Sequence, residues 1–237
     1  MAENENPLAL MKQIEATEGW KIMARIHTHS ISYHVFNGNY EELSRALKAY
    51  HDPEFGLTLW EVKNTAKLDL FQKEIIRLVH NYVASAKSLV EHTRNFVREH
   101  YSNSKFEKEY LSKVNETFHD PFSEFVIKLR DFTLHNGLPT IFSDLHLERG
   151  RPVEFRVLLD VISLRKWKRW SRKSKVYLKT LRPQVELDLV VEEYKSKVAE
   201  FYEWFGKEVQ ELHSKEFAQT NLLQQKLRDL SSGDMIS

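Results

Sequence analysis

Apolar positions between residues 64 and 136 step forward by three or four, which is the repeat of a helix with one buried face. Two runs show this repeat, on either side of a polar turn at 102–105. The first run contains Phe71, Ile75, Leu78, Tyr82, Ser85, Leu89, Thr93 and Phe96, and the second contains Phe106, Tyr110, Val114, Phe118, Phe122, Phe125, Leu129 and Phe132. The pattern predicts two long helices, and their short connection favours antiparallel packing in a helical bundle.

Polar residues stand where these helices are expected to begin and end. Ser104 precedes the second run and is a suitable N-cap. Pro121 interrupts that run, so it must kink the helix or restart it with Asp120 as the N-cap. Asn136-Gly137 ends the run. Ser171 is placed to cap a further short helix.

The pattern changes after Pro139. Apolar residues alternate on both sides of the sequence ERGRP, which predicts a β-hairpin over 140–164. Residues 186–213 return to the helical repeat and predict a third long helix. Its inward face is expected to carry Leu189, Tyr194, Val198, Phe201, Phe205 and Val209.

The first 60 residues are harder to interpret. Residues 39–50 predict a short amphipathic helix, whereas the apolar spacing of 20–36 fits neither helix nor strand cleanly. The turn at 51–56 suggests a boundary. We therefore predict an N-terminal helical extension over 1–60, a helical bundle over 61–228 that includes the hairpin, and a flexible tail over 229–237.

Composition supports a mainly α fold and narrows the possible functions. The 237 residues include only 7 glycines and 6 prolines, which favours long helices over many strands. A net charge of +1 means that any contact with nucleic acid must come from local charge segregation. The absence of cysteine excludes disulfides and thiolate metal sites. The N-terminus lacks a signal-peptide pattern and no apolar run approaches the ~20 residues of a membrane span, so we expect a cytoplasmic protein without a membrane partner.

Metal and cofactor motifs are not found in the sequence. There is no glycine-rich phosphate loop, and no metalloprotease or serine-hydrolase motif. His27, His29 and His34 lie close together, but histidines two apart diverge on a helix and no acidic ligand is adjacent. We therefore predict no metal and no cofactor.

The end of the second helical run carries the most informative spacing. Arg130 and His135 lie five residues apart just before Asn136-Gly137. The segment Arg130-Asp131-Phe132-Thr133-Leu134-His135 resembles the signature of the HEPN superfamily, an Arg, a polar residue, three further residues and a His. This resemblance implies an antiparallel helical bundle with the motif near the end of an interior helix. The hairpin at 140–164 departs from a minimal bundle of that family.

The resemblance also implies a function. Many HEPN proteins are metal-independent endoribonucleases that act in toxin–antitoxin or phage-defence systems, so it implies RNA as substrate and a cognate antitoxin or defence protein as partner. Arg130 and His135 would be the catalytic residues. Asp131 and the polar line of an earlier helix, Asn81, Ser85, Ser88 and His92, would support them.

These residue types suit RNA cleavage by the 2′-hydroxyl. A histidine exchanges a proton near neutral pH, and an arginine stabilises the charged phosphorane. Residues five apart on a helix point about 140° apart, so one chain does not close the site. We therefore expect a homodimer with residues 129–138 at or near the interface.

A basic segment, residues 165–179, is the second candidate. It contains no acid, and it places Trp167 and Trp170 among its cations. The cations predicted to bind nucleic acid are Arg165, Lys166, Lys168, Arg169, Arg172 and Lys173. The indoles would stack on unpaired bases. Alternatively, the segment is a solvated basic face beside the acidic third helix, with its tryptophans buried.

A non-catalytic explanation remains open for the motif as well. Asp131 can pair with His135 four residues later, Arg130 can extend along the helix to solvent, and His135 can cap the last carbonyls. The chain would then be a helical module that binds a protein or a nucleic acid.

Overall fold

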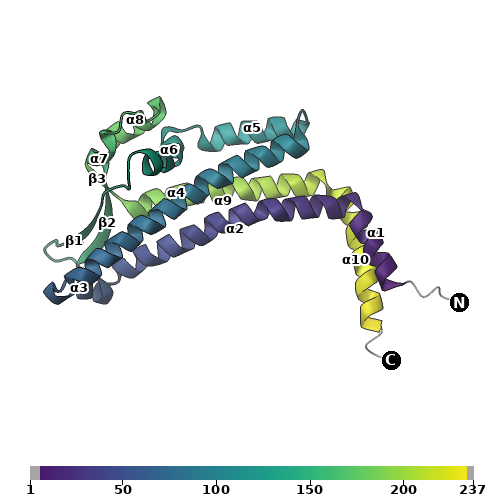
Figure 1. Cartoon of the computed structure of the whole chain (residues 1–237), viewed down its shortest axis with the longest axis horizontal. Coiled ribbons are helices and arrows are strands. Elements are labelled where there is room, and N and C mark those ends of the chain that lie inside the picture. The colour runs from purple at the N-terminus through teal and green to yellow at the C-terminus, as the bar shows by residue number, and fades with distance from the viewer. Residues whose placement is uncertain (1–5, 234–237) are drawn as a thin grey trace. The chain divides into compact units, whose positions relative to one another are not determined.

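The computed structural model describes residues 6–233 and is mainly helical, with one small antiparallel sheet (Figure 1). This confirms the predicted mainly α class. The helices are α1 Pro7–Ala16, α2 Glu18–His51, α3 Pro53–Trp60, α4 Thr65–Tyr101, α5 Lys105–Phe118, α6 Pro121–His135, α7 Val161–Arg165, α8 Arg172–Thr180, α9 Leu187–Leu212 and α10 Ser214–Gly233. The strands are β1 Ile141–His146, β2 Glu154–Asp160 and β3 Gln184–Glu186. Within residues 6–233, no helix combines the length and the apolar character needed to cross a bilayer.

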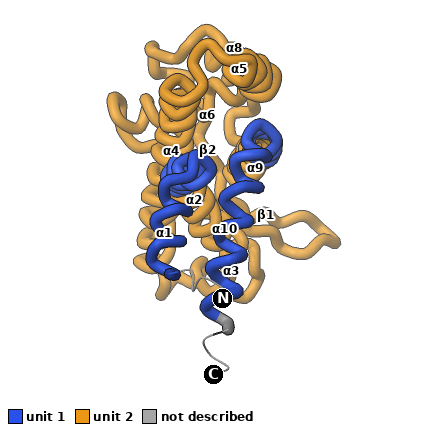
Figure 2. The backbone as a smooth tube through the Cα atoms, turned by 90° about the vertical axis from the view of Figure 1, so that its right-hand side faces the viewer, with its two compact units in different colours: residues 1–31, 202–237 blue, residues 32–201 orange. Residues whose placement is uncertain are grey.

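The chain forms two compact units (Figure 2). Unit 1 comprises the described parts of 1–31 and 202–237, and unit 2 comprises 32–201. The division runs through α2 and α9, whereas the sequence suggested a boundary near residue 60. The reason is that 20–36 and 39–50 form one uninterrupted helix, α2. Of the predicted tail, 229–233 continue α10 and 234–237 lie outside the described residues.

Unit 1 is held together by packing of α1 against α10. Leu10 and Ile14 of α1 are buried, as is Phe217 of α10. A hydrogen bond of 2.9 Å joins the hydroxyls of Thr17 and Thr220. Gly19 allows the first turn of α2 to approach α10 closely, because a Cβ at this position would lie 2.2 Å from the carbonyl oxygen of Glu216.

The core of unit 2 lies among α2, α4 and α9. The ring of Phe36 meets those of Tyr82 and Tyr194, which come from the other two helices. The buried Tyr82 hydroxyl donates to the carbonyl of Val191 at 3.0 Å. Helices α2 and α4 are antiparallel, since Ser32 meets His92 near one end and Tyr50 meets Phe71 near the other. Packing against α2 and α9 explains the apolar repeat that the sequence predicted on α4, because most residues of that repeat are buried.

The predicted N-caps are confirmed. Ser104 accepts from the amide of Glu107, Asp120 from those of Phe122 and Ser123, and Ser171 from that of Ser174. Pro121 restarts the helix and so separates α5 from α6.

One position on the third long helix was predicted wrongly. Leu189 is 63% exposed, whereas Leu187, Val190, Val191 and Tyr194 are buried. The buried face of α9 therefore begins at Leu187, and Leu189 points away from it.

The hairpin prediction is confirmed, with β1 and β2 paired antiparallel from Ile141↔Leu159 to His146↔Glu154. The hairpin was predicted to continue to residue 164, but the chain after Asp160 forms α7. The Asp160 carboxylate caps this helix by accepting hydrogen bonds from the amides of Ile162 and Ser163. The short strand β3, which the sequence did not indicate, pairs with β2. Phe155 packs against Gly56 of α3, which ties the sheet to the helices.

Candidate functional site

Helix α6 places the Arg130–His135 motif at its C-terminal end. Asp120 fixes the start of the helix, and His135 is its last residue. The amides of Asn136 and Gly137 both donate to the carbonyl of Phe132, and Gly137 adopts a φ of 137°, which favours glycine. The Asn-Gly sequence therefore ends the helix where the spacing predicted.

Arg130 is engaged by its neighbour in sequence. Its side chain is 37% exposed, and its guanidinium lies 3.5 Å from the carboxylate of Asp131. Asp131 also accepts a hydrogen bond of 2.8 Å from the Lys128 ammonium. The Asp131 carboxylate therefore binds two cations of the same helix, and it is not paired with His135 as the non-catalytic explanation proposed.

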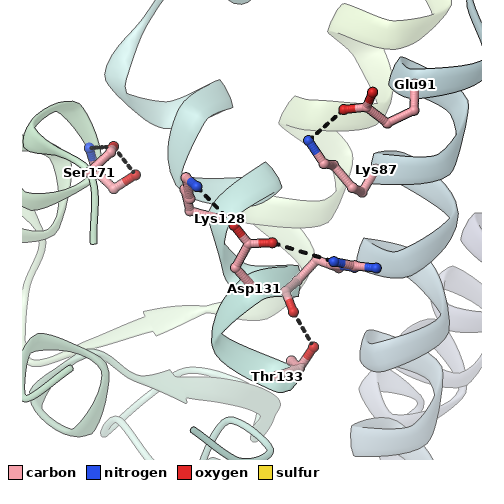
Figure 3. Close-up of polar contacts among 8 residues, drawn as sticks. Lys87, Glu91, Lys128, Asp131, Thr133 and Ser171 are labelled. Atoms are coloured by element: carbon pink, nitrogen blue, oxygen red, sulfur yellow. Dashed lines mark hydrogen bonds and ion pairs between the residues drawn. The ribbon is translucent and has the colours of Figure 1, made fainter. Parts of the chain in front are cut away.

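The surroundings of Asp131 change its ionisation. Burial raises the pKa of its carboxyl, but the hydrogen bond from Lys128 and the charges of Lys128, Lys87 and Arg130 together lower the pKa below its ordinary value. Figure 3 shows Lys87 and Glu91 on α4 opposite Lys128 and Asp131 on α6. Lys87 donates to Glu91 at 2.8 Å, and this hydrogen bond with the nearby positive charges lowers the pKa of Glu91. Cations of α4 alone thus favour the ionised form of Glu91, whereas cations of both helices favour that of Asp131.

His135 is exposed to solvent. Throughout residues 6–233, no hydrogen bond or ion pair connects its ring with Arg130. The geometry of a helix accounts for this separation, because the two residues point about 140° apart. A phosphate bound by both side chains would need a group from elsewhere to complete its surroundings.

The predicted supporting residues on α4 are not gathered around the motif. The hydroxyl of Ser85 is buried and donates to the carbonyl of Tyr82 in its own helix. His92 faces α2, where its Nδ1 lies 2.7 Å from the hydroxyl of Ser32. Asn81 is partly buried and Ser88 is exposed. The α4 residue whose charge acts on Asp131 is Lys87, which lies two residues beyond Ser85.

The tryptophans of the basic segment pack against α6. Trp170 is 4% exposed, its ring stacks on Phe132 at 5.7 Å, and its indole N–H donates to the carbonyl of Leu164. Trp167 is half-buried and meets Phe132 and Trp170 edge-on. Of the two alternatives for Trp170, stacking on bases or burial, the structure shows burial, because the faces of its ring contact the core.

Two of the predicted cations make contacts that position the chain. Arg165 donates to the carbonyls of Leu178 and Leu181, which lie at the end of α8. Lys173 donates to the carbonyl of His119 after α5. The remaining cations, Lys166, Lys168, Arg169 and Arg172, are exposed, and in the described part of the chain none has an ion-pair partner.

The structure adds residues that the sequence analysis did not select. Lys175 and Lys179 are exposed on α8 at positions three and seven after Arg172, so the three share one face. Their spacing in the sequence was a usable signal. Leu134 and Leu138 flank His135 and are 49% and 56% exposed. Other leucines on the described surface, such as Leu70 and Leu189, are exposed to a similar extent.

Two further findings concern metal ligands and similarity to known proteins. Among residues 6–233, no group of three or more His, Asp or Glu side chains is arranged to hold a metal ion. No protein-family model, curated protein or solved structure is significantly similar to this chain.

Proposed function

We propose that this chain is a HEPN-like, metal-independent endoribonuclease in which Arg130 and His135 act on RNA in a cleft that a second copy completes. The observation that carries the proposal is the exposed position of His135 at the end of α6, with the partly exposed Arg130 five residues before it. An exposed imidazole and a permanent cation are the two groups that phosphodiester cleavage by a 2′-hydroxyl requires, and a second copy would have to bring them together.

The chemistry needs no group beyond RNA and these side chains. The 2′-oxygen attacks phosphorus and loses its proton to a base, while the bond from phosphorus to the 5′-oxygen breaks. A protonated histidine gives its proton to the leaving 5′-oxygen, and Arg130 stabilises the charge on the phosphorane. The products are a 2′,3′-cyclic phosphate and a 5′-hydroxyl. In each cleft of a dimer, the histidine of one copy takes the proton of the 2′-hydroxyl as base and then gives it to the 5′-oxygen as acid, beside the arginine of the other copy.

A homodimer is part of the proposal. Leu134 and Leu138 lie on either side of His135, and burying them against a two-fold copy would remove apolar surface from water. The same pairing would bring each Arg130 towards the other copy's His135. A stable contact of this kind should bury more than roughly 1,000 Å² in total.

The proposed ribonuclease is expected to have a partner protein that restrains it. A metal-independent ribonuclease is harmful to its own cell unless it is restrained, so a cognate antitoxin or defence protein is the expected partner of a cytoplasmic enzyme in a toxin–antitoxin or phage-defence setting. The exposed cations after α7 are the surface that such a protein would cover.

A second function is favoured by one contact. Arg130 is paired with Asp131, and that carboxylate also binds Lys128. If these charges only stabilise α6, the chain is a non-catalytic module that binds RNA or a protein through the basic segment. The two functions predict opposite results when His135 is replaced.

The test is RNA cleavage in EDTA by the parent chain and by His135→Ala. We expect the replacement to reduce the rate by a factor of about 100 to 10,000, which is the usual contribution of a general acid or base. His119→Ala is the matched control, because His119 is another exposed histidine at the C-terminal end of a helix. Equal rates for the parent and His135→Ala, with unchanged melting, would assign the chain to the non-catalytic class.

A further inference from the structure

The solvent face of α8 carries a row of cations. Arg172, Lys175 and Lys179 are exposed, whereas Ser174 and Leu178 on the opposite face are buried. With a rise of about 1.5 Å per residue, the first and last cations lie about 10.5 Å apart along the helix. Because Ser171 caps the helix and Trp170 anchors its start, this row is held on a rigid element.

Acidic residues are absent from the sequence around this row. The sequence from residue 161 to residue 185 contains no Asp or Glu. No ion pair involves Arg172, Lys175 or Lys179 within 6–233. Lys166, Lys168 and Arg169 add exposed positive charge in the connection that precedes α8. The result is a concentrated positive surface, in contrast to the net charge of +1 for the chain.

Aromatic rings in this segment are engaged elsewhere. Trp170 is buried against Phe132, and Tyr177 packs on Phe122 and Phe125. Trp167 contacts Trp170 with its ring at 90°. Among the described residues from 161 to 185, no aromatic side chain is exposed. The surface therefore offers charge without a stacking platform.

A surface with exposed cations but no exposed aromatic ring is expected to bind duplexes more tightly than single strands. Single strands are held by aromatic side chains on which their bases stack, together with a basic groove. A duplex has its bases already stacked and presents a higher density of phosphates, so it gains more from counterion release at a purely cationic surface. Base-paired RNA is recognised mainly through its backbone and shape.

We infer that the outward face of α8, with Lys166, Lys168 and Arg169, binds the phosphate backbone of base-paired nucleic acid, and that the natural ligand is duplex RNA. This inference rests on the proposed function only for the choice of RNA. It names the substrate class that the Arg130–His135 site would meet, a paired region of RNA held next to the cleavage point.

The experiment measures binding of the full chain to a duplex of about 16 base pairs and to its single strand. Both are 2′-O-methyl RNA, which lacks the attacking hydroxyl and cannot be cleaved. We expect the duplex to bind at least about tenfold more tightly at low salt. The triple variant Arg172→Gln, Lys175→Gln, Lys179→Gln should reduce the salt slope on the duplex by about 2 to 3, at about 0.9 per phosphate contact.

A control variant matches the change in composition. Arg45→Gln, Lys48→Gln, Lys67→Gln removes one arginine and two lysines that are also exposed, from α2 and α4. We expect its salt slope to equal that of the parent. An equal slope for the α8 variant and the parent, or binding of the single strand as tight as that of the duplex, would overturn the inference.

A duplex DNA of the same sequence tests whether the surface binds RNA duplexes or DNA duplexes. Equal binding of the two duplexes supports recognition of phosphates, whereas tighter binding of DNA would overturn the assignment to RNA. None of these outcomes depends on cleavage. A chain that binds duplex RNA but whose cleavage is unaffected by His135→Ala would refute the proposed ribonuclease and leave this inference intact.

Discussion

Two groups of cations on neighbouring elements differ in what surrounds them. On α4 and α6, Lys87 pairs with Glu91 at 2.8 Å, and Asp131 lies 2.8 Å from Lys128 and 3.5 Å from Arg130. After α7, the exposed cations of the basic segment have no such partner within the described chain. The difference lies in the sequence, where an acid follows each cation of the first group by one, three or four residues and no acid lies that close to a cation of the second group. Lys87 and Lys128 of the first group are expected to stabilise the fold, and the cations of the second group to bind a polyanion.

Trp170 should show the largest effect, because the basic segment depends on it for its position. Replacement by Ala removes a buried indole that stacks on Phe132 and donates to the carbonyl of Leu164. We expect a loss of about 3–5 kcal/mol in the free energy of unfolding. Chemical denaturation measures it, and Trp20→Ala, at an exposed tryptophan of unit 1, should cost far less. A similar loss at both positions would show that Trp170 does not anchor the segment.

Leu134 and Leu138 test whether the motif lies at an interface. Leu134→Asp with Leu138→Asp should weaken the dimer by about a hundredfold, which corresponds to about 2.7 kcal/mol. Light scattering over a dilution series measures this change. Leu111→Asp with Leu189→Asp is the control, since these leucines are similarly exposed on α5 and α9. A parent chain that is monomeric at micromolar concentration would remove the dimer from the proposal.

Asp131 tests the paired group of cations. Its lowered pKa means that it stabilises the folded chain above its ordinary pKa, and that this contribution is lost as the pH falls through the folded value. We expect Asp131→Asn to cost about 1 kcal/mol at pH 7 and progressively less below about pH 4. Denaturation at several pH values measures the trend. Asp69→Asn, in the exposed pair with Lys73, should have little effect at any pH. A cost for Asp131→Asn that does not change with pH would argue against its charge as the cause.

Lys168 and Arg169 should show the smallest effect on stability. Both are exposed, and within residues 6–233 no carboxylate pairs with either of them. Replacing both with Gln should change the free energy of unfolding by less than about 0.5 kcal/mol. Denaturation at pH 7 is sufficient to measure this. A clear destabilisation would place these cations with the structural group and weaken the comparison.

Much of the fold followed from the pattern of apolar residues. The stripe of α4, the restart of the helix at Asp120-Pro121 and the hairpin were all predictable, because each has a strong local signal. Residues 39–50 of α2 were also predicted as helix, but its first part was not, since exposed apolar residues such as Ile31 and Val35 obscure the buried positions. Strand β3 is three residues long and depends on its pairing with β2, which no local signal reveals.

The sequence indicated which residues to consider for the candidate site, but it did not indicate the contacts that these residues make. The spacing of Arg130 and His135 identified both positions, and the cations of the basic segment were visible as a run. The sequence did not show that Trp170 would be buried, because a tryptophan among cations is compatible with both a stacking platform and a core residue. It also left the direction of His92 open, since α2 on one side and α6 on the other both pack near α4.

The most direct test of the central claim mixes two inactive variants. Arg130→Ala and His135→Ala are each expected to lose RNA cleavage in EDTA. If the cleft takes its arginine from one copy and its histidine from the other, random exchange of subunits forms one complete cleft in each mixed dimer, and the mixture recovers about a quarter of the parent's activity. A mixture that stays as inactive as its components, while light scattering shows that subunits have exchanged, would contradict a shared ribonuclease site.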